Sequence, residues 1–292
     1  MAHQTAEKRT NSFYWLMLTP SLLFLLAFLV VPFIMLIVLS FREVDSLLNV
    51  LPSYSIHNYI EVFTSSSYLT TIRTTLGVAA LTTVIVLLAA YPAAYLLVRT
   101  PYKGLRTLFY ILLISPLLTS VVIRTFAWIV ILAQNGLLNE VLLKLHLIDK
   151  PLTVLWSMKA VIIAYVQVML PFAVLPIATS MGEIQPKLRE ASMSLGAGRI
   201  RTFFKVTFPL TFPGMLSGAA IVFSLAAGSY ITPLLVGGRL QPLLPLSIYQ
   251  QTVQVFNMPF AAALAITLLA MVAIVVGLIS WISKRWEARL HD

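Results

Sequence analysis

Six long apolar runs constrain this chain more than any other feature of its sequence. They cover residues 13–41, 72–98, 106–134, 153–181, 208–237 and 260–283. Each exceeds the ~20 residues that a helix needs to cross the hydrocarbon core of a bilayer. Because lipid offers no hydrogen bonds to the backbone, helices are the expected form of such runs. The sequence therefore predicts an all-α polytopic membrane protein with six transmembrane helices.

The composition excludes several other classes of protein. Of the 292 residues, 59% are hydrophobic and only 10% are charged, which is unusual for a soluble domain. The chain has no cysteine, so disulfide and thiolate chemistry are excluded. Its four histidines, His3, His57, His146 and His291, are scattered and predict no metal site. We expect one membrane domain over 13–284, with tails at 1–12 and 285–292.

The distribution of Lys and Arg predicts how the six spans are oriented. Thirteen lie on one side: Lys8, Arg9, Arg99, Lys103, Arg106, Lys187, Arg189, Arg199, Arg201, Lys205, Lys284, Arg285 and Arg289. Six lie on the other: Arg42, Arg73, Lys144, Lys150, Lys159 and Arg239. By the positive-inside rule, both termini and the interval 181–209 are expected in the cytoplasm. The net charge of +10 is thereby explained by topology, and no nucleic-acid partner is expected.

The densest charge falls in the predicted cytoplasmic interval 181–209, between the fourth and fifth spans. Pro186 suits the first turn of a helix and Gly196 suits a helix stop, so Lys187 to Leu195 is predicted as a short helix. A second helix is predicted to begin near Arg199 and to run into the fifth span. Two short helices joined at a glycine, and continuous with a membrane span, are suited to transmitting movement.

Two features inside the spans are candidates for a translocation path. Arg124 is the only charge placed well inside a span, about 27 Å from the predicted inner end of its helix. It either extends to the outer surface or caps a backbone carbonyl, or it takes part in gating or solute passage. The segment from Gly228 to Pro233, which includes Tyr230 and Thr232, predicts either an unwound stretch with free carbonyls or a simple kink.

Several catalytic and energy-coupling motifs are absent. The chain has no phosphate-binding loop of the G-x-x-x-x-G-K-[ST] type, no H-E-x-x-H and no G-x-S-x-G. No Asp or Glu falls within a predicted span, which weakens a self-contained secondary carrier or channel, although that alternative stays open. A membrane enzyme and a non-transporting scaffold are further alternatives. Uphill transport would require another subunit to supply the energy.

The cytoplasmic interval resembles the EAA signature of binding-protein-dependent ABC importer permeases. The sequence has Glu190-Ala191-Ser192, then Gly196 after three residues, then Val206-Thr207-Phe208-Pro209 after nine more. Ser192, Val206 and Phe208 replace the usual Ala, Ile and Leu. The resemblance implies a type I permease fold whose coupling helices, about 184–206, dock on a cytoplasmic ATPase. It also implies that ATP and Mg²⁺ bind to that ATPase and that this chain holds no cofactor.

The likeness extends to the spermidine/putrescine permease subunits. It rests on Ser115 to Trp128, on Asn135-Gly-Leu-Leu-Asn139 and on Tyr230 to Gly238. The resemblance implies a second permease subunit, two ATPase copies and an extracytoplasmic solute-binding protein. It implies a polyamine or a related amine or opine as solute. Because no membrane carboxylate is present, cation contacts would fall on aromatic faces such as Phe126, Trp128 and Tyr230, or on the second permease.

Overall fold

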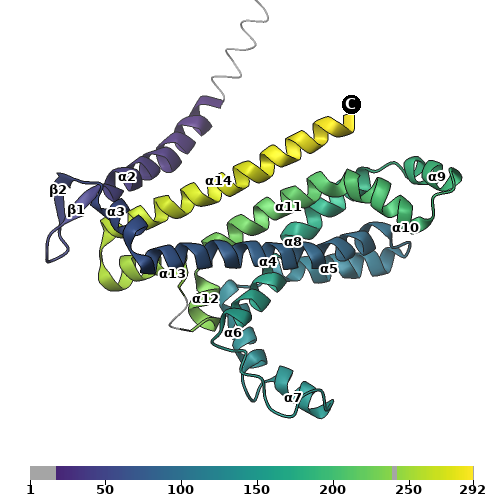
Figure 1. The fold of residues 1–292 in the computed structure, drawn as a ribbon, viewed down its shortest axis with the longest axis horizontal. Coiled ribbons are helices and arrows are strands. Elements are labelled where there is room, and N and C mark those ends of the chain that lie inside the picture. The colour runs from purple at the N-terminus through teal and green to yellow at the C-terminus, as the bar shows by residue number, and fades with distance from the viewer. Residues whose placement is uncertain (1–17, 239–241, 292) are drawn as a thin grey trace, which may run out of the picture.

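A computed structural model describes residues 18–238 and 242–291 of the chain (Figure 1). The described part contains six stretches that are long and apolar enough to cross a membrane: Leu18–Ser40, Ser66–Arg99, Val121–Lys144, Met158–Glu183, Arg199–Gly228 and Met258–Ala288. The predicted number of spans is therefore confirmed. The predicted tail at 1–12, the start of the first span at 13–17 and Arg239 lie outside the described residues. The division into tails and one domain stays a prediction.

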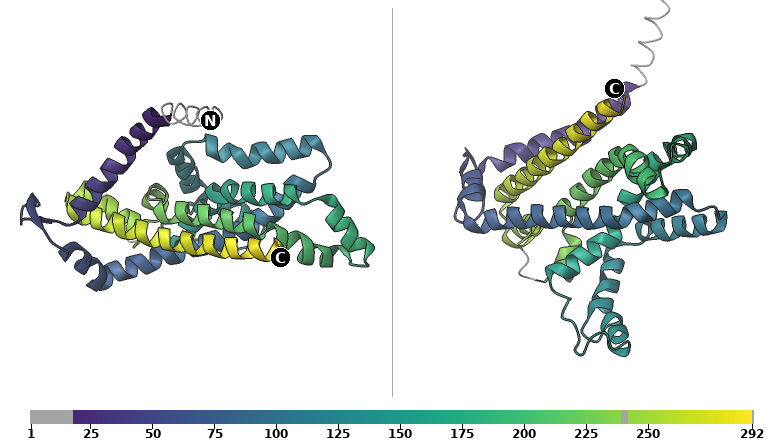
Figure 2. Two further views of the ribbon diagram at one scale, coloured as in Figure 1. Left: turned by 90° about the horizontal axis from the view of Figure 1, so that it is seen from above. Right: turned by 45° about the vertical axis from the view of Figure 1, so that its right-hand side comes forward.

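Three helices form the centre of the molecule. They are α4 (Ser66–Arg99), α8 (Met158–Glu183) and α11 (Phe208–Gly228), and α14 (Met258–His291) lies along α11. The first span, which includes η1 (Leu26–Val30) and α2 (Val31–Ser40), packs against α14 (Figure 2). Most of its side chains are exposed, as expected of a helix that faces lipid or a partner.

Glycines allow α8 and α11 to approach closely. A Cβ atom added at Gly214 would lie 2.7 Å from the carbonyl oxygen of Pro176 and 2.4 Å from Oγ of Ser180. One added at Gly218 would lie 3.1 Å from Cα of Ala173. Gly214 and Gly218 are four residues apart and so lie on one face of α11, in the small-xxx-small arrangement of membrane helices. Small residues in this span therefore permit the close packing of α8 and α11.

The third predicted span is not one continuous helix. It consists of α5 (Lys103–Leu118) and α6 (Val121–Leu132), separated by extended backbone at Thr119 and Ser120. Pro116 cannot donate a backbone hydrogen bond to the carbonyl of Leu112, four residues earlier, and Oγ of Ser115 donates to that carbonyl instead, at 3.1 Å. The two helices take different directions in Figure 1. The expectation of an unbroken helix over 106–134 is therefore wrong.

A short helix, α7 (Leu137–Lys144), follows α6 and is held by Asn139, whose side chain is 1% exposed. Its Nδ2 donates to the carbonyls of Ala133, at 3.1 Å, and Leu152, at 3.0 Å. Its Oδ1 accepts from the backbone N–H of Leu152 at 2.8 Å. One amide side chain thus fixes the loop before α8 to the end of α6.

The remaining small elements gather at one end of the molecule (Figure 1). They are an antiparallel hairpin of β1 (Arg42–Val44) and β2 (Val50–Tyr54), α3 (His57–Thr64), α13 (Leu244–Tyr249) and η3 (Gln250–Val255). The hairpin was not predicted, because each of its strands is too short to give a periodic signal. The backbone N–H of Leu244 donates to Oγ1 of Thr75 at 2.8 Å, which fixes α13 against α4.

Candidate functional site

Two short helices and a glycine form an elbow at the end of the molecule opposite the hairpin (Figure 1). The elbow consists of α9 (Pro186–Ser194), Gly196, α10 (Arg199–Thr202) and η2 (Phe203–Thr207), which continues into α11. Gly196 has φ +84°, a backbone conformation that other residues adopt only with strain. The two helices begin and end close to the residues that the sequence predicted.

A side-chain contact closes the elbow. Oγ of Ser192 on α9 and Oγ1 of Thr202 on α10 lie 3.1 Å apart, within hydrogen-bond distance. Thr202 is 2% exposed, whereas Glu190, Ala191 and Gly196 are exposed. The contact restrains the angle between the two helices, and it leaves Glu190 free to meet a partner. An alanine at position 192 could not form this hydrogen bond with Thr202.

Several large apolar side chains are exposed on the elbow, among charged ones. Leu195 is 89% exposed and Ile200 is 76% exposed, with Leu188 and Met193 exposed beside them. Large apolar side chains that gather on one projecting segment indicate a surface for another protein. The geometry therefore makes this elbow a candidate docking element.

The last part of the EAA-like segment is packed into the molecule. Val206, Phe208 and Pro209 are half-buried, and the ring of Phe208 lies 5.7 Å from that of Tyr91 on α4. The indole Nε1 of Trp286 on α14 donates to the carbonyl oxygen of Pro209 at 3.1 Å. The elbow is thus joined to α4 and α14 as well as to α11.

The fifth span is interrupted in the segment for which the sequence left either an unwound stretch or a simple kink open. Helix α11 ends at Gly228, Ser229 is extended, and α12 (Ile231–Val236) resumes after Tyr230. Pro233 lacks the N–H that would bond to the carbonyl of Ser229, and the hydroxyl of Tyr165 donates to that carbonyl at 2.8 Å. The unwound alternative is therefore the observed one.

A cavity of about 290 Å³ lies between the two interrupted helices. Its polar lining comes from Thr119, Arg124, Tyr165, Ser229 and Thr232. The Nη1 group of Arg124 donates to the carbonyl of Pro116 near the end of α5, so Arg124 caps a carbonyl and lines the cavity at once. Its Nε atom is buried and has no hydrogen-bond partner among the described residues. The cavity combines a guanidinium group and hydroxyl groups with apolar side chains.

Only some of the residues that were predicted to lie along a translocation path line this cavity. Arg124 and Thr232 do so, whereas Phe126, Trp128 and Tyr230 do not. Nε1 of Trp128 lies 3.4 Å from Oε1 of Gln167, and the ring of Tyr230 stacks on that of Tyr249 with centroids 5.5 Å apart. Phe126 is 54% exposed. Gly228 and Pro233 flank the break, Gly228 exposed and Pro233 buried.

Sequence reasoning missed Thr119, Tyr165 and Ser229 as lining residues of the cavity. For Ser229 a signal existed, because a proline in a helix leaves the carbonyl four residues before it unpaired. Tyr165 lies 64 residues earlier in the chain, and nothing local marks it as the donor to Ser229. Thr119 was hidden by the assumption that its helix is continuous.

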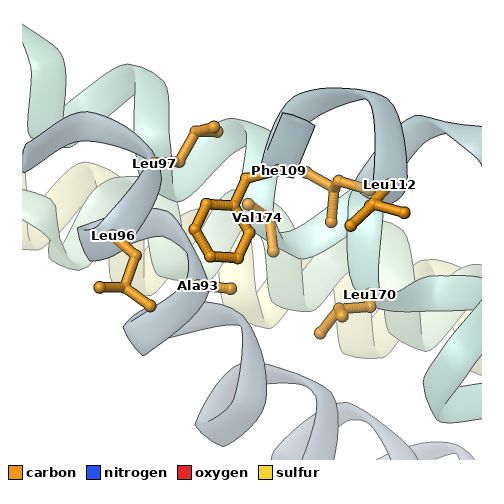
Figure 3. A pocket seen from close by; sticks show the side chains of 8 residues that line it. Ala93, Leu96, Leu97, Phe109, Leu112, Leu170 and Val174 are labelled. Carbon is orange, nitrogen blue, oxygen red and sulfur yellow. The ribbon is translucent and has the colours of Figure 1, made fainter. Parts of the chain in front are cut away.

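A second pocket, of about 230 Å³, lies between α4, α5 and α8 (Figure 3). The figure shows Phe109 of α5 between Leu96 and Leu97 of α4 and Val174 of α8. All its lining side chains are hydrocarbon, so it offers no polar group that could orient a solute. The cavity between the broken helices is therefore the better candidate for solute contact.

Interrupted helices around a cavity that contains several polar groups, within a bundle of membrane spans, are typical of multi-pass membrane transport proteins. The sequence comparisons identify its family. Residues 85–288 match the family described as "binding-protein-dependent transport system inner membrane component", and the chain belongs to that family. It is a multi-pass inner-membrane permease subunit and not an enzyme.

Relatives and solved structures agree with this assignment. The chain is 33% identical over 261 residues to the spermidine/putrescine transport system permease protein PotB of Escherichia coli (strain K12), covering 89% of this chain and 94% of PotB. It is 29% identical to the inner membrane ABC transporter permease protein YdcU of the same organism, covering 79% and 76%. A crystal structure of a bacterial ABC transporter that imports the acidic polysaccharide alginate has the same fold, with TM-score 0.79 at 18% identity, covering 97% and 99%.

Proposed function

We propose that this chain forms half of the translocation pathway of an ATP-driven importer and receives movement from a cytoplasmic ATPase through the α9–α10 elbow. The observation that carries the proposal is the set of large apolar side chains exposed on the elbow, with Leu195 89% exposed, on a segment in direct helical continuity with α11. Rotation of the elbow would turn α11. Ser229, the residue that follows the end of α11, lines the cavity. ATP and Mg²⁺ would bind to the ATPase and not to this chain.

The proposed residue roles follow from where each group lies. Glu190 offers an exposed carboxylate to a basic group of the ATPase, and exposed Ala191 permits close approach. Ser192 and Gly196 set the angle of the elbow. Val206, Phe208 and Pro209, half-buried, join the elbow to the membrane helices. These positions match the EAA-like spacing.

The proposed assembly contains a second permease subunit, two copies of the ATPase and an extracytoplasmic solute-binding protein. The family description names binding-protein-dependent transport, and one structural neighbour is a bacterial alginate transporter in complex with an alginate-bound periplasmic protein. Both termini and the elbow would lie in the cytoplasm, as the distribution of Lys and Arg predicts. The hairpin and α13 would then face the binding protein.

The proposed solute is a polyamine or a related amine or opine. The support is the similarity to PotB over most of the chain. The cavity with Arg124 and Thr232 would be the part of the pathway in this chain, flanked by Gly228 and Pro233. The exposed Phe126, the half-buried Trp128 and the stacked Tyr230 and Tyr249 present aromatic faces to a cation entering from outside.

Paired glycine substitutions test the coupling role. Gly196→Val forces a β-branched residue to φ +84°, whereas Gly198→Val sits at φ −66° with no atom within 4 Å of its Cβ. We expect Gly196→Val, and likewise Glu190→Ala, to abolish uptake and transport-coupled ATP hydrolysis while membrane insertion survives. Gly198→Val should retain both activities. Normal transport in Gly196→Val and Glu190→Ala would contradict the proposal.

A further inference from the structure

A wide groove opens on the side of the molecule where α4 meets the α10–η2 segment. Its volume is about 700 Å³, and its walls include Tyr95, Leu96, Ile200 and Phe204. Ile200 and Phe204 are 76% and 61% exposed, so the groove lies open along one side. It is separate from the cavity between the broken helices, with which it shares no lining residue.

One arginine lines this groove, and two more lie near its end. Arg199 lines it, and Arg99 follows Tyr95 by one turn of α4. Arg189 of α9 lies close enough to Arg99 for the two charges to repel each other. Such an arrangement raises the free energy of the folded chain unless an anion is bound between the arginines.

No carboxylate in the described part of the chain supplies that anion. Among the described residues, Lys144 and Glu140 on α7 form an ion pair, and none of the three arginines is paired with a carboxylate. Two guanidinium nitrogens of Arg99, Nε and Nη2, are buried and lack a hydrogen-bond partner among the described residues. Unsatisfied donors are costly, so an acceptor from outside this chain that meets the exposed part of this half-buried side chain would be favoured.

The position and the walls of the groove indicate what the acceptor belongs to. The arginines lie at the elbow end, where the membrane spans meet the polar surface and Lys and Arg collect. Aromatic and aliphatic walls match acyl chains, and a basic cluster at the membrane surface attracts anionic headgroups. A soluble anion would make no use of the apolar walls.

We propose that this groove binds an anionic phospholipid, whose phosphate contacts Arg99, Arg189 and Arg199 and whose acyl chains lie on the apolar walls. The lipid would bridge α4 and the elbow, two elements that move relative to each other if the elbow transmits movement. The binding itself does not depend on the proposed function, because it needs only the groove and the charges.

The test measures retained lipid by native mass spectrometry. The full chain, purified with the subunits that accompany it, is equilibrated with mixed micelles of phosphatidylglycerol and phosphatidylcholine. The Arg99→Gln/Arg189→Gln variant should retain about tenfold less phosphatidylglycerol than the wild type, with phosphatidylcholine unchanged. The control Arg106→Gln removes a charge from exposed α5 at the same end and should retain the wild-type amount. Phe204→Ser should also lower retention, because it removes part of the apolar wall.

Four outcomes would overturn the proposal. Two concern the variants: the double variant retains as much phosphatidylglycerol as the wild type, or Arg106→Gln loses as much as the double variant. Two concern the lipid: glycerol phosphate displaces it at a similar concentration, or it is absent from the complex when the ATPase is bound. If the double variant melts at a lower temperature than the wild type, the single variant Arg189→Gln is used for the retention measurement instead. Arg189 is half-buried on a surface helix, so its replacement should disturb the fold less. None of these readouts needs transport activity, so a failure of the importer proposal would be recognised separately.

Discussion

The indole Nε1 of Trp286 lies 3.1 Å from the carbonyl oxygen of Pro209 and donates a hydrogen bond to it. This carbonyl has no helical partner, because the residue four positions later is Pro213. The ring of Trp286 also lies 4.6 Å from that of Phe212. The end of α14 is therefore attached to α11 where the elbow enters the bundle.

Replacing Trp286 by Phe should loosen this attachment. The ring contact survives in part, but the carbonyl of Pro209 loses its donor, at a cost of about 0.5–1.5 kcal/mol. We expect a lower melting temperature in detergent and weaker coupling of ATP hydrolysis to uptake. Trp281→Phe is the matched control, because Trp281 is 53% exposed. Equal effects of the two substitutions would argue against a role for the hydrogen bond.

Tyr165→Phe should disturb the break in the fifth span. The substitution removes the hydroxyl that donates to the carbonyl of Ser229 at 2.8 Å, within a side chain that is 1% exposed. We expect about 1–3 kcal/mol of destabilisation from the stranded carbonyl, and altered uptake kinetics because the cavity wall changes. Tyr110→Phe, at a 47% exposed position on α5, should leave melting and uptake unchanged. An unaltered melting temperature in Tyr165→Phe would contradict this account of the break.

Gly214→Val should separate α8 from α11. Its Cβ would lie 2.7 Å from the carbonyl oxygen of Pro176, so the backbone must move. Overpacking of this kind costs about 1–3 kcal/mol. Gly77→Val places the same side chain on α4 with no atom within 4 Å, and we expect it to fold normally. Thermal unfolding in detergent distinguishes the two; similar melting temperatures would show that close packing at Gly214 is not needed.

Asn139→Ala should release the loop before α8. The substitution strands the carbonyl and the backbone N–H of Leu152, at about 1–3 kcal/mol for a group left unsatisfied, whereas the carbonyl of Ala133 keeps the hydrogen bond from the backbone N–H of Gly136. We expect faster proteolysis between α7 and α8. The exposed turn residue Asn135 provides the control as Asn135→Ala. Wild-type protease resistance in Asn139→Ala would mean that other contacts hold the loop.

The sequence predicted the features that depend on local chemistry. The elbow was predictable because Pro186 favours a helix start and Gly196 tolerates φ +84°. The break near Ser229 was predictable because Pro233 removes a backbone donor. The six apolar runs identified the spans without reference to their neighbours.

The features that the sequence did not predict depend on long-range contacts or on weak local signals. Tyr165 meets Ser229, and Ser192 meets Thr202, only once the helices are packed. The break at Thr119 was missed because an apolar run carries no sign of where its helix ends. The sequence left open whether Arg124 caps a backbone carbonyl or takes part in gating or solute passage. In the structure Arg124 caps the carbonyl of Pro116, and it also lines the cavity.

The central claim is that the elbow lies in the cytoplasm and is covered by an ATPase. The chain has no cysteine, so single cysteines can be introduced without background. Leu195→Cys replaces an 89% exposed residue of the elbow, and Leu47→Cys replaces an 80% exposed residue of the hairpin turn.

The decisive measurement is labelling of these two cysteines with a membrane-impermeant maleimide. In inside-out vesicles stripped of peripheral proteins, we expect Cys at 195 to react and Cys at 47 to be protected. Adding back the ATPase should protect Cys at 195, and right-side-out vesicles should show reaction at 47 alone. Labelling of Cys at 195 from the outside, or equal labelling with and without the ATPase, would contradict the account.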